Sequence, residues 1–140
     1  FLIGWAKPVP YNPANFKPEE RRMASIWVAA AGILANIAIA IFFSAIIRLA
    51  DVVSFIPESF IPLAGTIVLL NIVLAIFNLI PIPPLDGSKI LFGVLGYKSY
   101  RFERFFEKYS IFVLLFFVFF LWQFITPVVY LIFKSITGLS

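Results

Sequence analysis

The fold is decided by one stretch of the sequence, residues 59–87, which reads SFIPLAGTIVLLNIVLAIFNLIPIPPLDG. It carries no charge before Asp86, and the uncharged part is longer than the roughly 20 residues with which a helix crosses the hydrocarbon core of a membrane. Three prolines interrupt the apolar run shortly before Asp86. We therefore predict a membrane-spanning helix over residues 59–81 that ends in a turn at Leu85-Asp86-Gly87.

Two further uncharged runs lie on either side of this span in the sequence. Residues 23–47 lie between Arg22 and Arg48, and residues 109–133 lie between Lys108 and Lys134. Both are long enough to span a membrane as helices. Pro18 suits the first position of a helix, so we predict spans over residues 18–48 and 110–133.

The composition of the 140 residues excludes the common soluble classes. Apolar residues make up 62% of the chain and charged residues 13%, against roughly 45–50% and 25% in soluble domains. So much apolar surface excludes both a soluble domain of this size and a disordered chain. We predict an all-α membrane protein in which residues 1–140 form a single membrane domain.

The positions of the basic residues predict how the spans are oriented. The N-terminal flank carries four Lys or Arg residues, the loop after the first span one, the loop after the second span five, and the tail one. Basic residues concentrate in cytoplasmic segments. We therefore expect the N-terminal flank and the Leu85-Asp86-Gly87 loop on the cytoplasmic side of a multi-pass protein. We therefore attribute the net charge of +4 to the orientation of the chain in its partner, the lipid bilayer. We expect no nucleic acid as a partner.

Two segments are predicted to lie at the membrane surface. In residues 97–109 the aromatic side chains of Phe102, Phe105, Phe106 and Tyr109 recur at helical spacing among basic residues, which predicts an interfacial amphipathic helix. Residues 1–17 contain Pro8, Pro10 and Pro13, and prolines at this density favour extended backbone. This short extended segment is either a surface loop or an edge that pairs with a peptide.

Asp86 is the candidate for chemistry. Pro81, Pro83 and Pro84 break the helix before it, and broken helices are tolerated in a bilayer only where protein or water surrounds them. Gly87 permits a sharp turn there. A carboxylate inside the membrane is by default a candidate functional group. Spacing alone also allows the alternative that Asp86 has reached the cytoplasmic surface in an ordinary turn.

A second polar group lies on the first span. Residues 29–40 are rich in small side chains, which let another helix approach closely. Asn36 follows Gly32 by one turn, on the same face. This face is either a packing surface with one interhelical hydrogen bond or a polar group beside a site.

The segment Asn78-x-x-Pro81-x-x-x-Leu85-Asp86-Gly87 resembles the NxxPxxxLDG signature of the site-2 protease family of intramembrane zinc metalloproteases. Residues 4–13 (GWAKPVPYNP) and 31–36 (AGILAN) resemble two further segments of that family, in the family's order. No soluble insert separates the predicted spans, which is similar to the compact members without a PDZ domain. Such members imply a bacterial or archaeal cell membrane.

The resemblance implies a function and roles for individual residues. In the family, a helix with a His-Glu-x-x-His motif supplies two zinc ligands and a general base, and the Asp of the LDG motif is the third protein ligand. Carried onto this sequence, Asp86 is that zinc ligand. The residues expected to support the active site or bind substrate are Asn78, Pro81, Gly87, Asn36 and Gly32. The implied substrates are membrane-spanning helices of other proteins.

The sequence departs from the family at Ile33, where a Pro is common, and more seriously because its 140 residues include no His and no Cys. The His-Glu-x-x-His motif is absent, so we expect this chain alone neither to bind zinc tightly nor to cleave peptides. We expect the missing helix upstream of Phe1 in a longer polypeptide. The alternatives are a relative that has lost catalysis, a non-catalytic membrane protein that binds other transmembrane helices, and a fragment of a transporter with broken helices.

Overall fold

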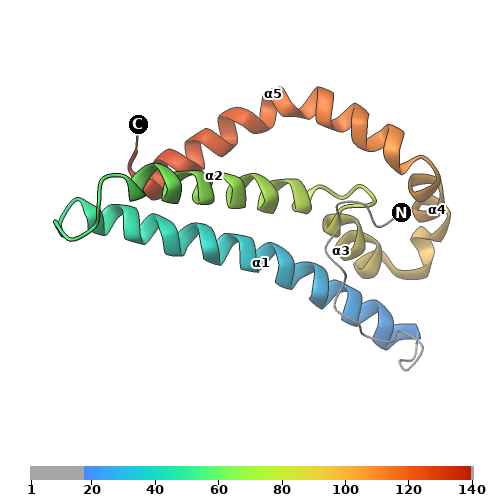
Figure 1. The fold of residues 1–140 in the computed structure, drawn as a ribbon. Coiled ribbons are helices and arrows are strands. Elements are labelled where there is room, and N and C mark those ends of the chain that lie inside the picture. Colours follow the sequence, from blue (N-terminus) through green and yellow to red (C-terminus); the bar gives the residue numbers. More distant parts are fainter. Residues whose placement is uncertain (1–17, 140) are drawn as a thin grey trace.

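The computed structural model describes residues 18–139, which form helices joined by short connections (Figure 1). The helices are α1 (Pro18–Ala50), α2 (Phe60–Leu79), α3 (Asp86–Leu95), the 3-10 helix η2 (Gly96–Ser99), α4 (Tyr100–Lys108) and α5 (Ser110–Thr137). No strand occurs in this part of the chain. The predicted all-α class is confirmed there, while the extended segment predicted over residues 1–17 lies outside the described residues.

Three of these helices are long and apolar enough to cross a membrane: α1, α2 and α5. They run in alternating directions, with α2 antiparallel to α1 and α5 again antiparallel to α2 (Figure 1). Large apolar side chains cover their outer surfaces, for example Phe112 and Phe119 of α5, which are 74% and 83% exposed. Surfaces of this kind suit a lipid environment. The prediction of three membrane-spanning helices is confirmed.

The core joins α1, α2 and α5 near the end of the bundle that carries the α1–α2 loop. Its buried residues are Ala40, Ile47, Ala64, Val68, Ile72, Ile125 and Val129. Two of them, Ala40 and Ala64, are small, and small residues let membrane helices pack closely. At the opposite end α5 diverges from α2, and α3 and α4 lie there instead (Figure 1).

Arg48 ties the C-terminal ends of α1 and α5 together. Its Nε donates a hydrogen bond to the carbonyl of Ile136 and its Nη2 donates one to the carbonyl of Ser135, both at 2.7 Å. The last carbonyls of a helix have no partner within the helix. Arg48 therefore caps α5 and closes the core end of the bundle.

The expected amphipathic segment consists of two helical pieces, η2 and α4. Gly96, the first residue of η2, has a φ of +69°. This left-handed conformation ends α3. Phe106 of α4 packs on Phe92 of α3, with ring centroids 6.4 Å apart. Phe102 and Phe105 are 67% and 57% exposed, so α4 presents aromatic side chains outward, as an interfacial helix does.

Candidate functional site

The site begins where α2 ends. Ile80 is extended, with φ −64° and ψ 126°, and its N–H donates to the carbonyl of Phe77. A residue that precedes proline avoids the helical region, so Pro81 keeps Ile80 out of the helix. The helix therefore stops at Leu79, whereas we expected the span to continue to residue 81.

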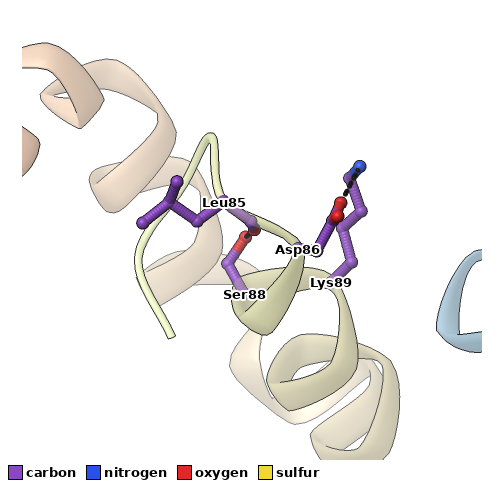
Figure 2. A network of polar contacts seen from close by, with 4 residues as sticks. All are labelled: Leu85, Asp86, Ser88 and Lys89. Carbon is purple, nitrogen blue, oxygen red and sulfur yellow. Dashed lines mark hydrogen bonds and ion pairs between the residues drawn. The ribbon is translucent and has the colours of Figure 1, made fainter. Parts of the chain in front are cut away.

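A tight turn then leads into α3. The N–H of Ile82 donates to the carbonyl of Ile80, and the N–H of Leu85 donates to the carbonyl of Ile82, each at 2.9 Å. Leu85 is extended, and α3 begins directly at Asp86. The side-chain hydroxyl of Ser88 donates to the carbonyl of Leu85 at 2.7 Å (Figure 2). Leu85-Asp86-Gly87 is thus the start of a helix, not only the turn that we expected.

Asp86 suits this position because a carboxylate at the N-terminus of a helix is stabilised by the helix dipole. The apolar residues Ile90, Leu91 and Val94, followed by Gly96 as the C-terminal stop, are the sequence pattern that indicates α3. The prediction of a turn at residues 85–87 overlooked this helical pattern.

Gly87 holds α3 against the end of α2. A Cβ atom at this position would lie 2.5 Å from the carbonyl oxygens of both Leu79 and Ile80. Among the described residues, Gly96 and Gly138 have positive φ angles and Gly87 does not. Gly87 is therefore required for a close approach between backbones, and the sharp turn that we expected is not the reason.

Two contacts bring α1 alongside α3. A Cβ atom on Gly93 would lie 2.5 Å from Cγ1 of Ile26, and a Cβ atom on Gly32 would lie 3.5 Å from Oδ2 of Asp86. Since the residue numbers rise along α1 as they fall along α3, the two helices are antiparallel. Gly32 and Asp86, which are far apart in the sequence, face each other across this packing.

Among residues 18–139, the carboxylate of Asp86 has one charged partner. Nζ of Lys89 donates to Oδ1 of Asp86 at 2.8 Å (Figure 2). The side chains of Asp86 and Lys89 are 29% and 52% exposed, and exposed pairs of this kind contribute roughly 0–1 kcal/mol. The pair therefore holds the carboxylate weakly. Lys89 was not predicted as a partner, although the i, i+3 spacing predicts such a pair once α3 is recognised as a helix.

The other residues predicted from the sequence, Asn36, Asn78 and Pro81, do not contact Asp86 through hydrogen bonds. Ile37 of α1 and Leu79 of α2 line the same cavity, so the turns that carry Asn36 and Asn78 lie at the same level of the bundle. Both asparagines are half-buried, and Pro81 is exposed. Within residues 18–139, no hydrogen bond links either amide to Asp86.

The donors of this chain do not make a complete metal site. Residues 18–139 contain no group of three or more His, Cys, Asp or Glu side chains that could hold a metal ion, and the whole sequence lacks His and Cys. A catalytic zinc needs three protein ligands and an open position. Asp86 offers one carboxylate, so the residues described do not fit a zinc centre by themselves.

Comparison with known proteins gives a family match over this region. The model of peptidase family M50 matches residues 48–121, which include α2, the turn, Asp86 and α4. The chain is also 34% identical over 94 residues to a protein of Bacillus subtilis (strain 168) named "Putative zinc metalloprotease YwhC". That alignment covers 64% of this chain and 42% of the relative. No solved structure matches the chain significantly.

Proposed function

The chain belongs to peptidase family M50, the site-2 protease family, and from this membership we propose that it is part of an intramembrane zinc metalloendopeptidase in which Asp86 is the third zinc ligand. The observation that carries the proposal is the placement of Asp86 at the start of α3, with Oδ2 facing Gly32 of α1. Its substrates are membrane-spanning segments of other proteins. The chain spans 42% of the length of the relative that it matches.

The surroundings of Asp86 support a role as a ligand. At Gly87 and Gly93, α3 packs so closely on its neighbours that a Cβ atom would overlap them. The carboxylate therefore belongs to a closely packed helix. Its partner Lys89 is half exposed. A divalent cation attracts a carboxylate more strongly than an ammonium group does at the same distance, so Lys89 does not prevent a metal from taking its place.

The face of α1 that points toward Asp86 leaves room for a further helix. Gly32 and Ala35 are exposed on this face, and they are flanked by Val28 and Ile39, which are 55% and 40% exposed. Small residues at a membrane surface let another helix come close. We place the helix that supplies two histidines here. This chain alone, lacking them, is inactive.

The proposal is tested by peptide cleavage in a polypeptide that contains this chain together with a His-Glu-x-x-His helix. Asp86→Asn keeps the size of the side chain and removes the negative charge. We expect it to reduce cleavage more than about 100-fold. Changing a residue that only hydrogen-bonds to a metal ligand already lowers metal affinity or activity by up to that factor. The control is Asp51→Asn, which changes an exposed aspartate in the α1–α2 loop and should leave cleavage unchanged.

Cleavage by Asp86→Asn at the wild-type rate would refute the assignment. It would favour the second candidate, a non-catalytic protein that binds other transmembrane helices through the exposed face of α1. The coding sequence upstream of Phe1 separates the two independently. An apolar segment with His-Glu-x-x-His in the same frame supports the protease, and a stop codon or unrelated sequence contradicts it.

A further inference from the structure

A cavity of about 600 Å³ lies among α1, α3, η2 and α4, apart from the face between Asp86 and Gly32. The polar side chains that line it are Arg21, Arg22, Ser25, Lys89, Tyr100 and Glu103. We propose that this cavity binds the phosphate group of an anionic phospholipid.

The expected depth of the cavity in the membrane favours a lipid headgroup as the group that supplies the phosphate. Arg21 and Arg22 lie where the apolar part of α1 begins. On the other side the cavity is bounded by α4, whose Phe102 and Phe105 point outward. An interfacial helix lies at the depth of the headgroups, and basic pockets between helices at that depth suit anionic headgroups.

The basic side chains come from two helices and converge on one space. Arg21 and Arg22 belong to α1, and Lys89 belongs to α3. Guanidinium groups match phosphate oxygens with paired N–H donors, and lysine adds a compact positive charge. The hydroxyls of Ser25 and Tyr100 add donors at the same cavity.

Arg22 lies against Gly96 at the edge of this cavity. A Cβ atom at Gly96 would lie 2.9 Å from Nη1 of Arg22, so the guanidinium group contacts the end of α3. The φ of +69° at Gly96 disfavours any other residue at this position. The backbone therefore accommodates a basic side chain at the edge of the cavity.

Glu103 is the one acidic side chain among those lining residues, and it opposes a bound anion only in its charged form. Burial, and next the negative charge of Glu107, raise the pKa of the Glu103 carboxyl above its ordinary value. The charge of Glu103 opposes a bound anion, so replacing Glu103 with a neutral side chain tests the site.

Lys89 connects the cavity to the proposed metal ligand. Its ammonium group lines the cavity and also pairs with Asp86. A phosphate in the cavity therefore competes with Asp86 for Lys89 and leaves the carboxylate less encumbered. The binding of phosphate itself requires neither zinc nor proteolysis, so the two proposals can fail independently.

The test titrates the purified protein in neutral maltoside micelles with three probes: dioctanoyl phosphatidylglycerol, dioctanoyl phosphatidylcholine and inorganic phosphate. Bound ligand is counted by native mass spectrometry. We expect phosphatidylglycerol to bind at least about tenfold more tightly than phosphatidylcholine. Arg21→Gln should weaken phosphatidylglycerol binding about fivefold, the effect of one basic residue at a membrane surface.

Two further variants keep the test specific. Glu103→Gln should strengthen binding of phosphatidylglycerol, because it removes the opposing charge without changing the size of the side chain. Arg101→Gln removes a positive charge from α4 outside the cavity and should leave the affinity nearly unchanged. Arg21→Lys, which keeps the charge, should retain most of the affinity and shows that loss in Arg21→Gln is not misfolding.

Three results would overturn the proposal. Equal affinity for the two lipids would exclude recognition of an anionic headgroup. If Arg21→Gln and Arg101→Gln weakened phosphatidylglycerol binding equally, general attraction between charges would explain the binding without a site in the cavity. Binding of inorganic phosphate that depends on Arg21, without binding of phosphatidylglycerol, would assign the cavity to a soluble phosphate instead of a lipid.

Discussion

Asp86 is positioned by glycines that lie on both sides of it. Gly87 and Gly93 bring α3 against α2 and α1, and Gly32 leaves open the space in front of Oδ2. Each glycine matters through the atom that it lacks, since a Cβ at Gly87 or Gly93 would overlap its neighbour. The location of the carboxylate therefore depends on residues that have no functional group of their own.

The contact at Gly87 can be tested by adding a single methyl group. In Gly87→Ala the new Cβ would meet two carbonyl oxygens at 2.5 Å, so α3 must move away from α2. We expect the free energy of unfolding in micelles to fall by about 1–3 kcal/mol, as overpacked sites typically lose. Gly65→Ala is the matched control, because its Cβ would lie 3.7 Å from Phe133, an ordinary contact. Equal stability of the two variants would contradict the packing described here.

The open space in front of Asp86 can be filled deliberately. A Cβ at Gly32 fits at 3.5 Å from Oδ2, so Gly32→Ala should be tolerated, whereas Gly32→Leu should displace the carboxylate and abolish cleavage by the complete polypeptide. Ala31→Leu introduces the same side chain at an exposed position about 100° around the helix. Activity retained in Gly32→Leu, or lost equally in Ala31→Leu, would show that the space before Asp86 is not used.

Asp86 could be singled out from the sequence because proline, carboxylate and glycine follow one another within a few residues. Lys89 could not be, and Gly32 was expected near the active site only from the family resemblance, without its contact to Asp86. Lys89 becomes a neighbour only if α3 is a helix, and Gly32 becomes one only if α1 and α3 pack antiparallel. The role of Gly87 was predicted from its freedom to turn, but the structure uses its lack of a side chain. Contacts between distant segments leave no local pattern in a single sequence.

Among the elements, the spans follow from composition, whereas their ends depend on local chemistry. Long apolar runs predicted α1, α2 and α5, and Pro81 accounts for the end of α2. Helix α3 was not predicted, because the prolines and Gly87 favoured a turn over residues 85–87. Its stability comes from packing of Phe92 and Gly93 on neighbouring helices, which no propensity scale records.

The cap between α1 and α5 is expected to stabilise the last turn of α5. Arg48→Met removes both hydrogen bonds to the carbonyls of Ser135 and Ile136, and we expect a loss of about 1–2 kcal/mol. Hydrogen exchange at the amide of Gly138, which donates to Lys134, should become faster. Lys134→Met removes a positive charge from the same turn without this cap. An equal effect of the two variants would show that charge alone, not the hydrogen bonds, holds the helix end.

On the scale of the whole molecule, the alternating helices place the α1–α2 loop and the C-terminal end of α5 at one end, and α3 and α4 at the other (Figure 1). Among the described residues, Arg21 and Arg22 of α1 and the five basic residues of 89–108 lie at the second end. The distribution of these residues predicts that this end faces the cytoplasm. Asp86 and the basic cavity would then both open toward the cytoplasmic side.

The orientation can be tested cleanly because the sequence has no cysteine. Single substitutions Ser54→Cys, in the α1–α2 loop, and Glu107→Cys, on α4, place one exposed thiol at each end. In intact bacterial cells a membrane-impermeant maleimide should label the cysteine at position 54 and should reach position 107 only after the membrane is opened. The reverse pattern would invert the predicted orientation.

The most direct measurement is the zinc content of the purified polypeptide that contains both this chain and a His-Glu-x-x-His helix. Zinc per protein is determined by mass spectrometry for the wild type, Asp86→Asn and the control Asp51→Asn, after dialysis against a weak chelator. We predict about one zinc per wild-type and Asp51→Asn molecule, and a large loss in Asp86→Asn. Full zinc occupancy in Asp86→Asn would contradict the assignment of Asp86 as a metal ligand.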